Sequence, residues 1–383
     1  MQRMVTSTLP LVVEGRLVLD DRVAPGRIAV EDGRISAVDV GGPAAEHGPS
    51  IAPGFVDVHV HGGGGHDAMG DTAALDGMAR HLMRRGVTSF LPTAVSAPLS
   101  SLVAFAERVR AWLPDAPRDG AEPLGFDLEG PFLAKARRGA HDAKHLRIPT
   151  DVGRDELEPL LEGLRLVTIA PELPGALDLV GWFRERGVAV SVGHSAATAD
   201  EARAGYAAGA SSTTHLFNGM TGLDHRAPGL ALAALLDDAA YVELIADGVH
   251  VDAALWPLVA RLKPADRLLL VSDANALAGV GDGRARIGGL EVEVVDQRAT
   301  LVGTATLAGS VIALDDAVRN LVASGVPLAA AVAAASRNPL TLLGIADRGR
   351  IAVGQRADLV ELDESLRVCR VMRGGTWFDA GAG

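Results

Sequence analysis

The chain has 383 residues, of which 48% are hydrophobic and 22% are charged. This length can bury a substantial core, and the composition excludes a disordered, collagen-like or disulfide-scaffold protein. The formal net charge of −12 opposes non-specific binding to nucleic acid, so no nucleic-acid partner is expected and an anionic ligand would need local cations.

Membrane and secretion signals are not expected. No run of the sequence reaches 18 consecutive apolar residues, because Asp237, Asp238 and Glu243 interrupt the most apolar region. The apolar stretch at residues 9–13 is too short for the core of a signal peptide. The single cysteine, Cys369, fits a reducing compartment. We therefore expect no membrane association and a cytoplasmic protein.

The two ends of the chain have a strand-and-turn character. Residues 11–19 and 26–38 alternate in polarity, and Asp32-Gly33 is a hairpin signal between two strand-like runs. Residues 349–362 and 366–375 have the same character. We predict a tail at 1–9, a small β-sandwich domain made of 10–52 and 346–383, and a separate domain over 53–345.

Between the two ends, short β-rich runs alternate with Ala/Leu/Arg-rich helical stretches. Eight such runs occur, and eight β-α units predict an α/β fold of the (β/α)8 TIM-barrel type. The runs end at His61, Thr93, Glu129, Glu172, His194, His215, Asp247 and Asp273. Residues 286–303 interrupt the pattern after the eighth run and predict an inserted β-hairpin beside the mouth of the barrel.

Metal-binding residue types collect at the ends of these runs. His59 and His61 are two positions apart on a strand, so both imidazoles leave the same face and can bind one metal ion. Because the carboxyl ends of barrel strands meet at one face, further strand-end residues should join them there. The expected set is His59, His61, Glu129, His194, His215 and Asp273. The alternative is that these residues are ordinary solvated strand caps.

The chain resembles the amidohydrolase superfamily and, within it, the N-acetylglucosamine-6-phosphate deacetylases, from about Gly15 to Gly375. The general signal is Pro-Gly-Phe-Val-Asp-Val-His-Val-His-Gly at residues 53–62. More specific motifs follow in the order of the family at 128–132, 139–141, 170–172, 193–195, 214–218, 226–229, 246–250, 272–274 and 307–310.

The resemblance implies a metal-dependent enzyme. Related hydantoinases, dihydroorotases and ureases bridge two metals with a carbamylated lysine on the fourth strand, but none of the three lysines here ends a barrel strand. Glu129 is the position that carries the metal carboxylate in the deacetylases. With His194 and His215 it implies one site, and His59 and His61 imply a second ion sharing Glu129. One or two divalent ions are expected; zinc is the first choice, with iron, cobalt and manganese open.

The resemblance also assigns catalytic roles. Asp273 corresponds to the family's acid/base, which takes a proton from water and returns it to the leaving amine; its alternative is a structural helix N-cap. His141 corresponds to the histidine that stabilises the oxyanion, and its alternative is a solvated loop histidine. Asp57 either orients a metal ligand or satisfies buried backbone groups.

Substrate contacts are implied in the same way. Arg226 and His250 match the ligands of the sugar 6-phosphate, and a planar guanidinium suits phosphate. Asn218 and Gly219 should offer backbone N–H donors, with Gly219 standing where relatives commonly have alanine. Further sugar-contacting positions match at Ala140, Leu307, Ala308 and Gly309. The glycine run 62–65 is expected to be a flexible loop, with a phosphate nest as the alternative.

The function expected from the resemblance is deacetylation of N-acetyl-D-glucosamine 6-phosphate to D-glucosamine 6-phosphate and acetate, by a homodimer. The enzyme alternatives are an N-acetylgalactosamine-6-phosphate deacetylase and an N-acyl-D-amino-acid deacylase. The alternative of another class is a metal-free scaffold on the same barrel.

Overall fold

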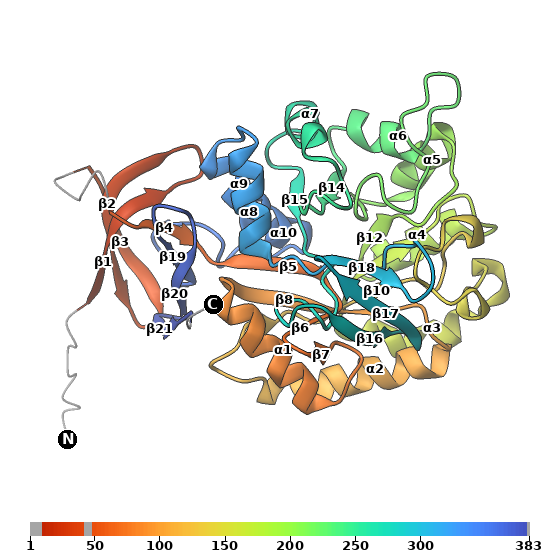
Figure 1. Ribbon diagram of the computed structural model, residues 1–383, viewed down its shortest axis with the longest axis horizontal. Coiled ribbons are helices and arrows are strands. Elements are labelled where there is room, and N and C mark those ends of the chain that lie inside the picture. The colour runs from red at the N-terminus through yellow and green to blue at the C-terminus, as the bar shows by residue number, and fades with distance from the viewer. Residues whose placement is uncertain (1–9, 42–47, 381–383) are drawn as a thin grey trace.

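Figure 1 shows the computed structural model of the chain, which describes residues 10–41 and 48–380. The predicted tail at 1–9 lies outside these ranges. A small body of strands from both ends of the chain stands beside a larger barrel of strands and helices. In the part of the chain that is described, no helix has the length and apolar character needed to span a membrane.

The larger body confirms the predicted barrel. Eight strands lie side by side, and each neighbouring pair is parallel. They are β5 (Phe55–Val60), β8 (Val87–Val95), β10 (Phe126–Glu129), β11 (Leu164–Ile169), β12 (Ala189–Val192), β13 (Ser212–Thr213), β14 (Tyr241–Leu244) and β15 (Leu268–Leu270). A short strand, β9 (Glu122–Pro123), adds to β8.

Hydrogen bonds at the carboxyl ends join the first barrel strand to the eighth. The Asp273 N–H donates to the His59 carbonyl, and the His61 N–H donates to the Ala274 carbonyl, both at 2.9 Å. The segments that carry three of the predicted site residues are thereby tied to one another by their own backbones.

Helices surround the barrel because their apolar positions repeat at helical spacing. In α8, for example, Leu314, Ala317, Val318 and Leu321 form one buried stripe. The helices are α1 (Thr72–Arg84), α2 (Leu99–Trp112), α3 (Arg154–Leu161), α4 (Ala176–Glu185), α5 (Ala199–Ala208), α6 (Leu230–Leu236), α7 (Trp256–Leu262), α8 (Leu314–Ala323), α9 (Leu328–Ala334) and α10 (Arg337–Leu342). Short 3₁₀ helices span Leu113–Asp115, Lys135–Arg137, Ala143–His145, Pro149–Asp151 and Ala253–Leu255.

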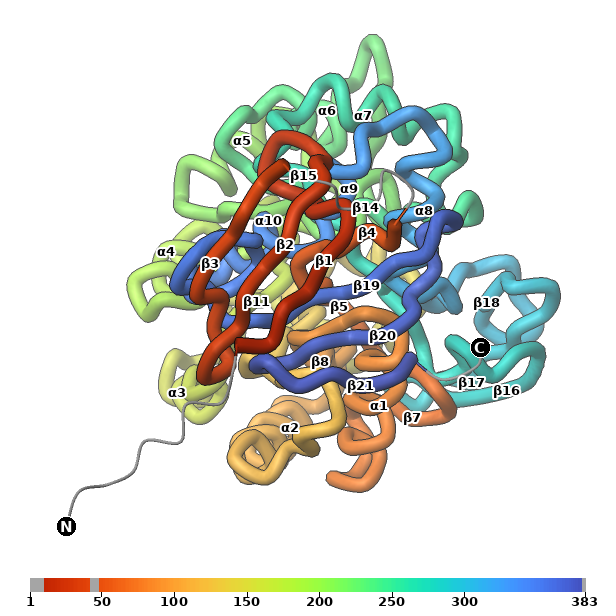
Figure 2. The backbone as a smooth tube through the Cα atoms, turned by 90° about the vertical axis from the view of Figure 1, so that its left-hand side faces the viewer, coloured from red at the N-terminus to blue at the C-terminus, as the bar shows by residue number. Residues whose placement is uncertain are grey.

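Both chain ends contribute to the smaller body, as the sequence predicted (Figure 2). Its strands are β1 (Leu11–Val18), β2 (Val23–Glu31), β3 (Arg34–Val40), β4 (Ser50–Pro53), β19 (Leu359–Leu362), β20 (Val368–Arg373) and β21 (Thr376–Asp379). Asp32 and Gly33, both with positive φ, form the predicted turn between β2 and β3. Side chains from the two halves, such as Ile28 and Leu359, share one core, so the strands form a small sandwich. The domain boundaries at 52/53 and 345/346 stay a prediction.

The insertion after the eighth barrel strand has one strand more than predicted. It is an antiparallel sheet of β16 (Gly283–Ile287), β17 (Leu290–Val295) and β18 (Arg298–Leu301). The predicted hairpin at 286–303 missed the start of β16, because the charged run Arg284-Ala-Arg286 has no apolar alternation. Ile287 and Val292 pack with Val95 of the barrel, which holds the sheet over the barrel mouth.

Candidate metal centre and active site

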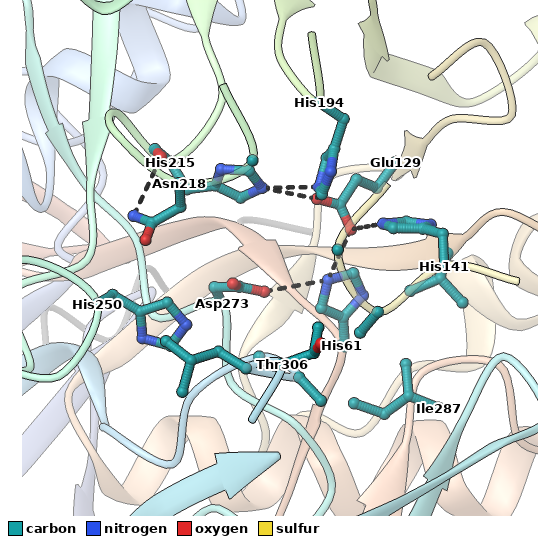
Figure 3. A pocket seen from close by; sticks show the side chains of 17 residues that line it. His61, Glu129, His141, His194, His215, Asn218, His250, Asp273, Ile287 and Thr306 are labelled. Atoms are coloured by element: carbon teal, nitrogen blue, oxygen red, sulfur yellow. Dashed lines mark hydrogen bonds and ion pairs between the residues drawn. The ribbon is translucent and has the colours of Figure 1, made fainter. Parts of the chain in front are cut away.

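The six predicted strand-end residues converge. His59 lies in β5, Glu129 ends β10, and the other four follow β5, β12, β13 and β15 within three residues of the strand end. All six are buried, with exposed fractions of at most 7%. Figure 3 shows Glu129 with His61, His194, His215 and Asp273 around it, and His59 is left out of the view. Solvated strand caps would be exposed, so that alternative is wrong.

Glu129 lies at the centre of the cluster. Its Oε1 atom lies 2.8 Å from His194 Nε2 and 2.9 Å from His215 Nε2, and these two nitrogens are 3.0 Å apart. Its Oε2 atom lies 3.3 Å from His61 Nε2 and 3.0 Å from His141 Nε2. His59 Nε2 also lies 3.6 Å from Oε1, so one carboxylate faces five imidazoles.

The histidine pair of β5 forms the second half of the cluster. The Nε2 atoms of His59 and His61 lie 3.3 Å apart. Asp273 Oδ1 lies 3.2 Å from His61 Nε2 and 3.7 Å from His59 Nε2. The two imidazoles thus point at the space between the Glu129 and Asp273 carboxylates.

Hydrogen bonds on the outer nitrogens indicate what these imidazoles bind. His59 Nδ1 faces Glu243 Oε2 at 3.1 Å, His61 Nδ1 faces the Thr93 carbonyl at 3.1 Å, and His194 Nδ1 faces the Arg137 carbonyl at 2.7 Å. Because each outer partner is an acceptor, the neutral imidazole carries its proton on Nδ1 and presents the Nε2 lone pair inward. Lone pairs converging on carboxylate oxygens are the donor set that a divalent cation requires.

The electrostatics of the cluster also call for positive charge. Burial raises the pKa of Glu129, but the surrounding imidazoles outweigh it and hold the pKa well below the ordinary value. Burial lowers the pKa of His61, but the Asp273 and Glu129 carboxylates raise it to about 10. The carboxylates that would otherwise hold protons on these nitrogens can hold metal ions in their place.

Within residues 10–41 and 48–380, two groups of side chains are close enough to bind a metal ion. One is His59, His61 and Glu129, and the other is Glu129, His141 and His194. His141 differs from the other imidazoles because its Nδ1 accepts the Ser96 N–H at 3.1 Å. Burial lowers the pKa of His141 to about 4, so it is neutral near pH 7 and carries its proton on Nε2. It is therefore a hydrogen-bond donor, and His215 is the better third ligand beside His194.

Backbone strain marks the same positions. The φ angles are +44° at His194, +28° at His215 and +49° at Asp273. Residues other than glycine rarely adopt this region of backbone conformation. Such conformations cost on the order of 1–3 kcal/mol each and gather at functional sites. Asp273 precedes irregular turns, so the helix N-cap alternative is wrong.

A pocket of about 260 Å³ opens above the cluster. The predicted substrate residues that line it are Ala140, Asn218, Gly219, His250, Leu307, Ala308 and Gly309. Arg226 does not line it: this exposed side chain lies in the loop before α6 and borders a separate hollow with Ala197 and Thr198. Val95, Ile287 and Thr306 also line the pocket, and the sequence analysis missed them because no local motif marks them.

His250 lines this pocket and pairs with a carboxylate. Its Nδ1 lies 2.7 Å from Asp247 Oδ2, and the Asp247 Oδ1 atom accepts the backbone N–H groups of Val249 and His250. Burial lowers the pKa of His250, but the Asp247 carboxylate outweighs it and raises the pKa above its ordinary value. The pair favours an imidazolium at the edge of the pocket.

Two further expectations are decided by hydrogen bonds. Asp57 Oδ1 accepts the backbone N–H groups of His59 at 3.4 Å and Ser272 at 3.3 Å, so it satisfies buried backbone groups. In the glycine run, the N–H groups of Gly64 and Gly65 donate to the Ala278 and Ala276 carbonyls, so they are not available to a phosphate.

The sequence is similar to known enzymes over nearly its whole length. The amidohydrolase family model matches residues 50–378. The chain is 39% identical to an N-acetylgalactosamine-6-phosphate deacetylase of Escherichia coli O157:H7, covering 92% of this chain and 93% of that protein. It is 37% identical to the N-acetylglucosamine-6-phosphate deacetylase of Bos taurus, covering 94% of this chain and 88% of that protein.

Solved structures agree with the sequence relatives. The N-acetylglucosamine-6-phosphate deacetylase of Thermotoga maritima superposes with a TM-score of 0.90 at 35% identity, covering 96% of this chain and all of that chain. A mutant of the Mycobacterium smegmatis enzyme, in complex with N-acetyl-D-glucosamine-6-phosphate, has a TM-score of 0.89 at 36% identity, covering 97% and 99%. By sequence and fold, this chain belongs to the amidohydrolase superfamily and, within it, to the N-acetylglucosamine-6-phosphate deacetylase family.

Proposed function

We propose that this chain hydrolyses the acetamide group of N-acetyl-D-glucosamine 6-phosphate, releasing acetate and D-glucosamine 6-phosphate. One observation carries the proposal: the Nε2 atoms of His59, His61, His194 and His215 converge on the Glu129 carboxylate beside one pocket, and Asp273 lies against His61. The near full-length similarity to deacetylases of this substrate supports the choice of reaction.

The proposed metal positions share Glu129. His59 and His61 would hold one divalent ion together with Glu129, and His194 and His215 would hold another. A bound divalent ion activates water for attack and polarises the amide carbonyl. Zinc is our first choice; because imidazole and carboxylate ligands also suit iron, cobalt and manganese, elemental analysis has to identify the ion.

Asp273 and His141 are proposed to act on protons at the reacting group. Burial raises the pKa of Asp273, but the neighbouring His61 and His59 together outweigh burial and lower the pKa below its ordinary value, so the carboxylate is ionised and can accept a proton from the attacking water. It then returns that proton to the leaving amine. His141 donates its Nε2–H to the carbonyl oxygen as negative charge develops there.

The sugar phosphate is proposed to bind along the side of the pocket that carries His250. An imidazolium supported by Asp247 provides charge, and the backbone near Asn218 and Gly219 provides N–H donors. Gly219 has a φ of +59°, and a Cβ there would lie 2.9 Å from His194 Nδ1, so glycine leaves room for the ligand histidine. Arg226 stays a prediction, because its side chain lies outside the pocket lining.

A second candidate substrate is N-acetyl-D-galactosamine 6-phosphate. It is favoured by the 39% identity to the Escherichia coli deacetylase named for that sugar. The two sugars differ only in the direction of the C4 hydroxyl, so the same metal and phosphate contacts serve both.

Acetate release from four substrates tests the function: both epimers, each with and without the 6-phosphate. We expect the phosphorylated glucosamine derivative to have the highest kcat/KM. A higher value for the galactosamine epimer would select the second candidate. Equal turnover of phosphorylated and free sugars would instead favour the N-acyl-D-amino-acid deacylase alternative.

We also propose a homodimer in the cytoplasm, on the strength of the family resemblance and of a single, exposed cysteine. Sedimentation of the purified protein tests the dimer, and fractionation of the source cells tests the compartment.

A further inference from the structure

Glu243 is a charged residue in the buried barrel strand β14, where apolar side chains are usual. It is the third residue of β14 and has no exposed surface, while its neighbours Val242 and Leu244 belong to the hydrophobic core. Successive residues of a strand point to opposite faces, so Glu243 points away from the side that Val242 and Leu244 share. A buried carboxylate is costly unless hydrogen bonds compensate it.

The hydrogen bonds of Glu243 lead to two of the proposed metal ligands. Its Oε2 atom lies 3.1 Å from His59 Nδ1 and accepts the backbone N–H of His215, also at 3.1 Å. Its Oε1 atom has no hydrogen-bond partner in the described part of the chain. One oxygen from the seventh barrel strand therefore contacts a ligand from the first strand and a ligand that follows the sixth.

We propose that Glu243 is a positioning residue for the metal centre. By accepting the Nδ1–H of His59, it holds the imidazole in the tautomer whose Nε2 lone pair faces Glu129 and Asp273. By accepting the His215 N–H, it supports the strained turn that carries the other ligand, whose φ is +28°. The inference rests on the proposed metal centre and not on the identity of the substrate.

The other outer partners in the cluster cannot be removed by mutation in the same way. His61 and His194 use the backbone carbonyls of Thr93 and Arg137. Asp57 contacts only the backbone of the ligand segment, and both carboxyl oxygens of the fully buried Asp127 lack a partner. Replacing Glu243 therefore tests what an outer hydrogen bond contributes to metal binding. Asp127, a buried carboxyl without such a hydrogen bond, is the matched control.

Metal affinity of the apoprotein tests the proposal without any sugar substrate. The protein is stripped with a chelator and titrated with Zn²⁺ against a chromophoric competitor, and thermal melts of each variant check the fold. Loss of an outer carboxylate typically weakens metal binding 10- to 100-fold. We expect Glu243→Ala to show that loss at the His59/His61 position.

Glu243→Gln distinguishes positioning from simple structural damage. Its amide oxygen can take the place of Oε2 and accept both hydrogen bonds, although more weakly than a charged oxygen, so we expect a loss of only about three- to fivefold. If Glu243→Ala does not fold, this smaller loss still has to appear. Asp127→Asn removes a buried carboxyl without breaking a contact to a ligand and should bind Zn²⁺ like the wild type.

The double variant His59→Gln with His61→Asn separates the two positions. In that background, adding Glu243→Ala should weaken the remaining affinity only through the lost contact to the His215 N–H. The proposal is overturned if Glu243→Ala or Glu243→Gln binds both ions with unchanged affinity. It is also overturned if Asp127→Asn loses as much, or if Glu243→Ala leaves the His59/His61 position unaffected. An enzyme that is inactive on every sugar would remove the proposed function and leave this result intact.

Discussion

Asp273 and His141 face the Glu129 cluster from different directions in the pocket (Figure 3). Asp273 Oδ1 lies 3.2 Å from His61 Nε2, whereas His141 accepts a backbone N–H at Nδ1 and can donate from Nε2. Asp273 is therefore suited to accept a proton, and His141 is suited to donate a hydrogen bond to an oxyanion.

Replacing Asp273 should therefore affect turnover more than metal content. We expect Asp273→Asn to lower kcat by about 10² to 10⁴, the usual contribution of a positioned proton carrier. Acetate release gives kcat, and elemental analysis of the same sample gives the metal content. Wild-type turnover would remove the assignment, and loss of metal together with activity would make Asp273 mainly a ligand.

The number of metal ions depends on the histidine pair in β5. We expect two ions per chain after reconstitution, and one in the variant His59→Gln with His61→Asn, because Glu129, His194 and His215 remain. Elemental analysis per protein chain measures both. A wild type that never exceeds one ion, with the same content in the variant, would reduce the centre to one metal position.

His250 should distinguish phosphorylated from free sugar. A charge-assisted hydrogen bond contributes on the order of 1.5–3 kcal/mol, which corresponds to about 10- to 150-fold in kcat/KM. We expect His250→Ala to show this loss with the 6-phosphate sugar and little change with N-acetylglucosamine.

Arg226→Ala, measured in the same assays, tests the second predicted phosphate ligand. The same selective loss would show that the Arg226 loop reaches the substrate when it binds. If both variants lose kcat/KM equally on the two sugars, or lose none, the phosphate binds elsewhere in the protein.

At the scale of elements, the glycine run beside the site packs against helix α1 and does not bind a ligand. Gly63 and Gly64 lie against the imidazole of His81 in α1, and a Cβ at either would come within 3 Å of that ring. Gly279, after the eighth barrel strand, approaches the same ring. Burial lowers the pKa of His81 to about 4, and the nearby Arg85, Arg84 and His66 add to this shift against the opposing effect of Asp315.

This packing should make stability depend on pH. The pKa of His81 is lower in the folded state than its unfolded value near 6.5, so the unfolded chain takes up the proton first. The stabilisation is complete above pH 6.5 and is lost as the pH falls toward 4, by up to about 3 kcal/mol. The free energy of unfolding in urea should thus differ most between wild type and His81→Gln at pH 7.

The difference should shrink as the pH approaches 4. His225→Gln, a change at an exposed loop histidine, is the control and should follow the wild type at every pH. A constant difference between wild type and His81→Gln would contradict the shifted pKa.

At the scale of the molecule, a group of ion pairs joins the barrel to the sandwich of chain ends. Glu122 in β9 lies 3.2 Å from Arg348 and 3.5 Å from Arg373, and it also pairs with Arg356. Burial raises the pKa of Glu122, but the three guanidinium groups outweigh it and lower the pKa below its ordinary value. One carboxylate thus pairs with two arginines of the segment that returns to the sandwich and with Arg373 at the end of β20.

Glu122→Gln removes the carboxylate that the three arginines share, whereas Arg348 keeps its pair with Asp347 and Arg356 keeps its pair with Asp358. Removing one partner of a buried pair costs about 3–5 kcal/mol, and because Glu122 is 28% exposed we expect about 1–3 kcal/mol less free energy of unfolding. Urea unfolding measures it. Glu162→Gln breaks an exposed pair with Arg110 and should cost under about 1 kcal/mol. Equal small effects would mean that the group does not hold the two bodies together.

The strand order and the strand-end residues could be predicted from the sequence. Barrel strands are short apolar runs, and a polar residue at the end of each run is visible without coordinates. For that reason the six residues of the metal centre and the pairing of the two chain ends could be predicted from the sequence. The extent of the inserted sheet was harder to predict, because the charged residues of β16 interrupt the alternation of apolar and polar residues that marks a strand.

Only the tertiary structure decided the contacts between strands that lie far apart in sequence. The Glu243 carboxyl meets His59 across 184 positions, and Ser96 selects the proton position of His141 across 45. Such contacts depend on barrel closure and side-chain packing, which no local pattern encodes. The same holds for Arg226, whose motif predicted a phosphate ligand while the fold of its loop placed the side chain outside the pocket. The sequence by itself thus determined the type of barrel and the chemistry at its mouth; tertiary packing determined which atoms of that chemistry face one another.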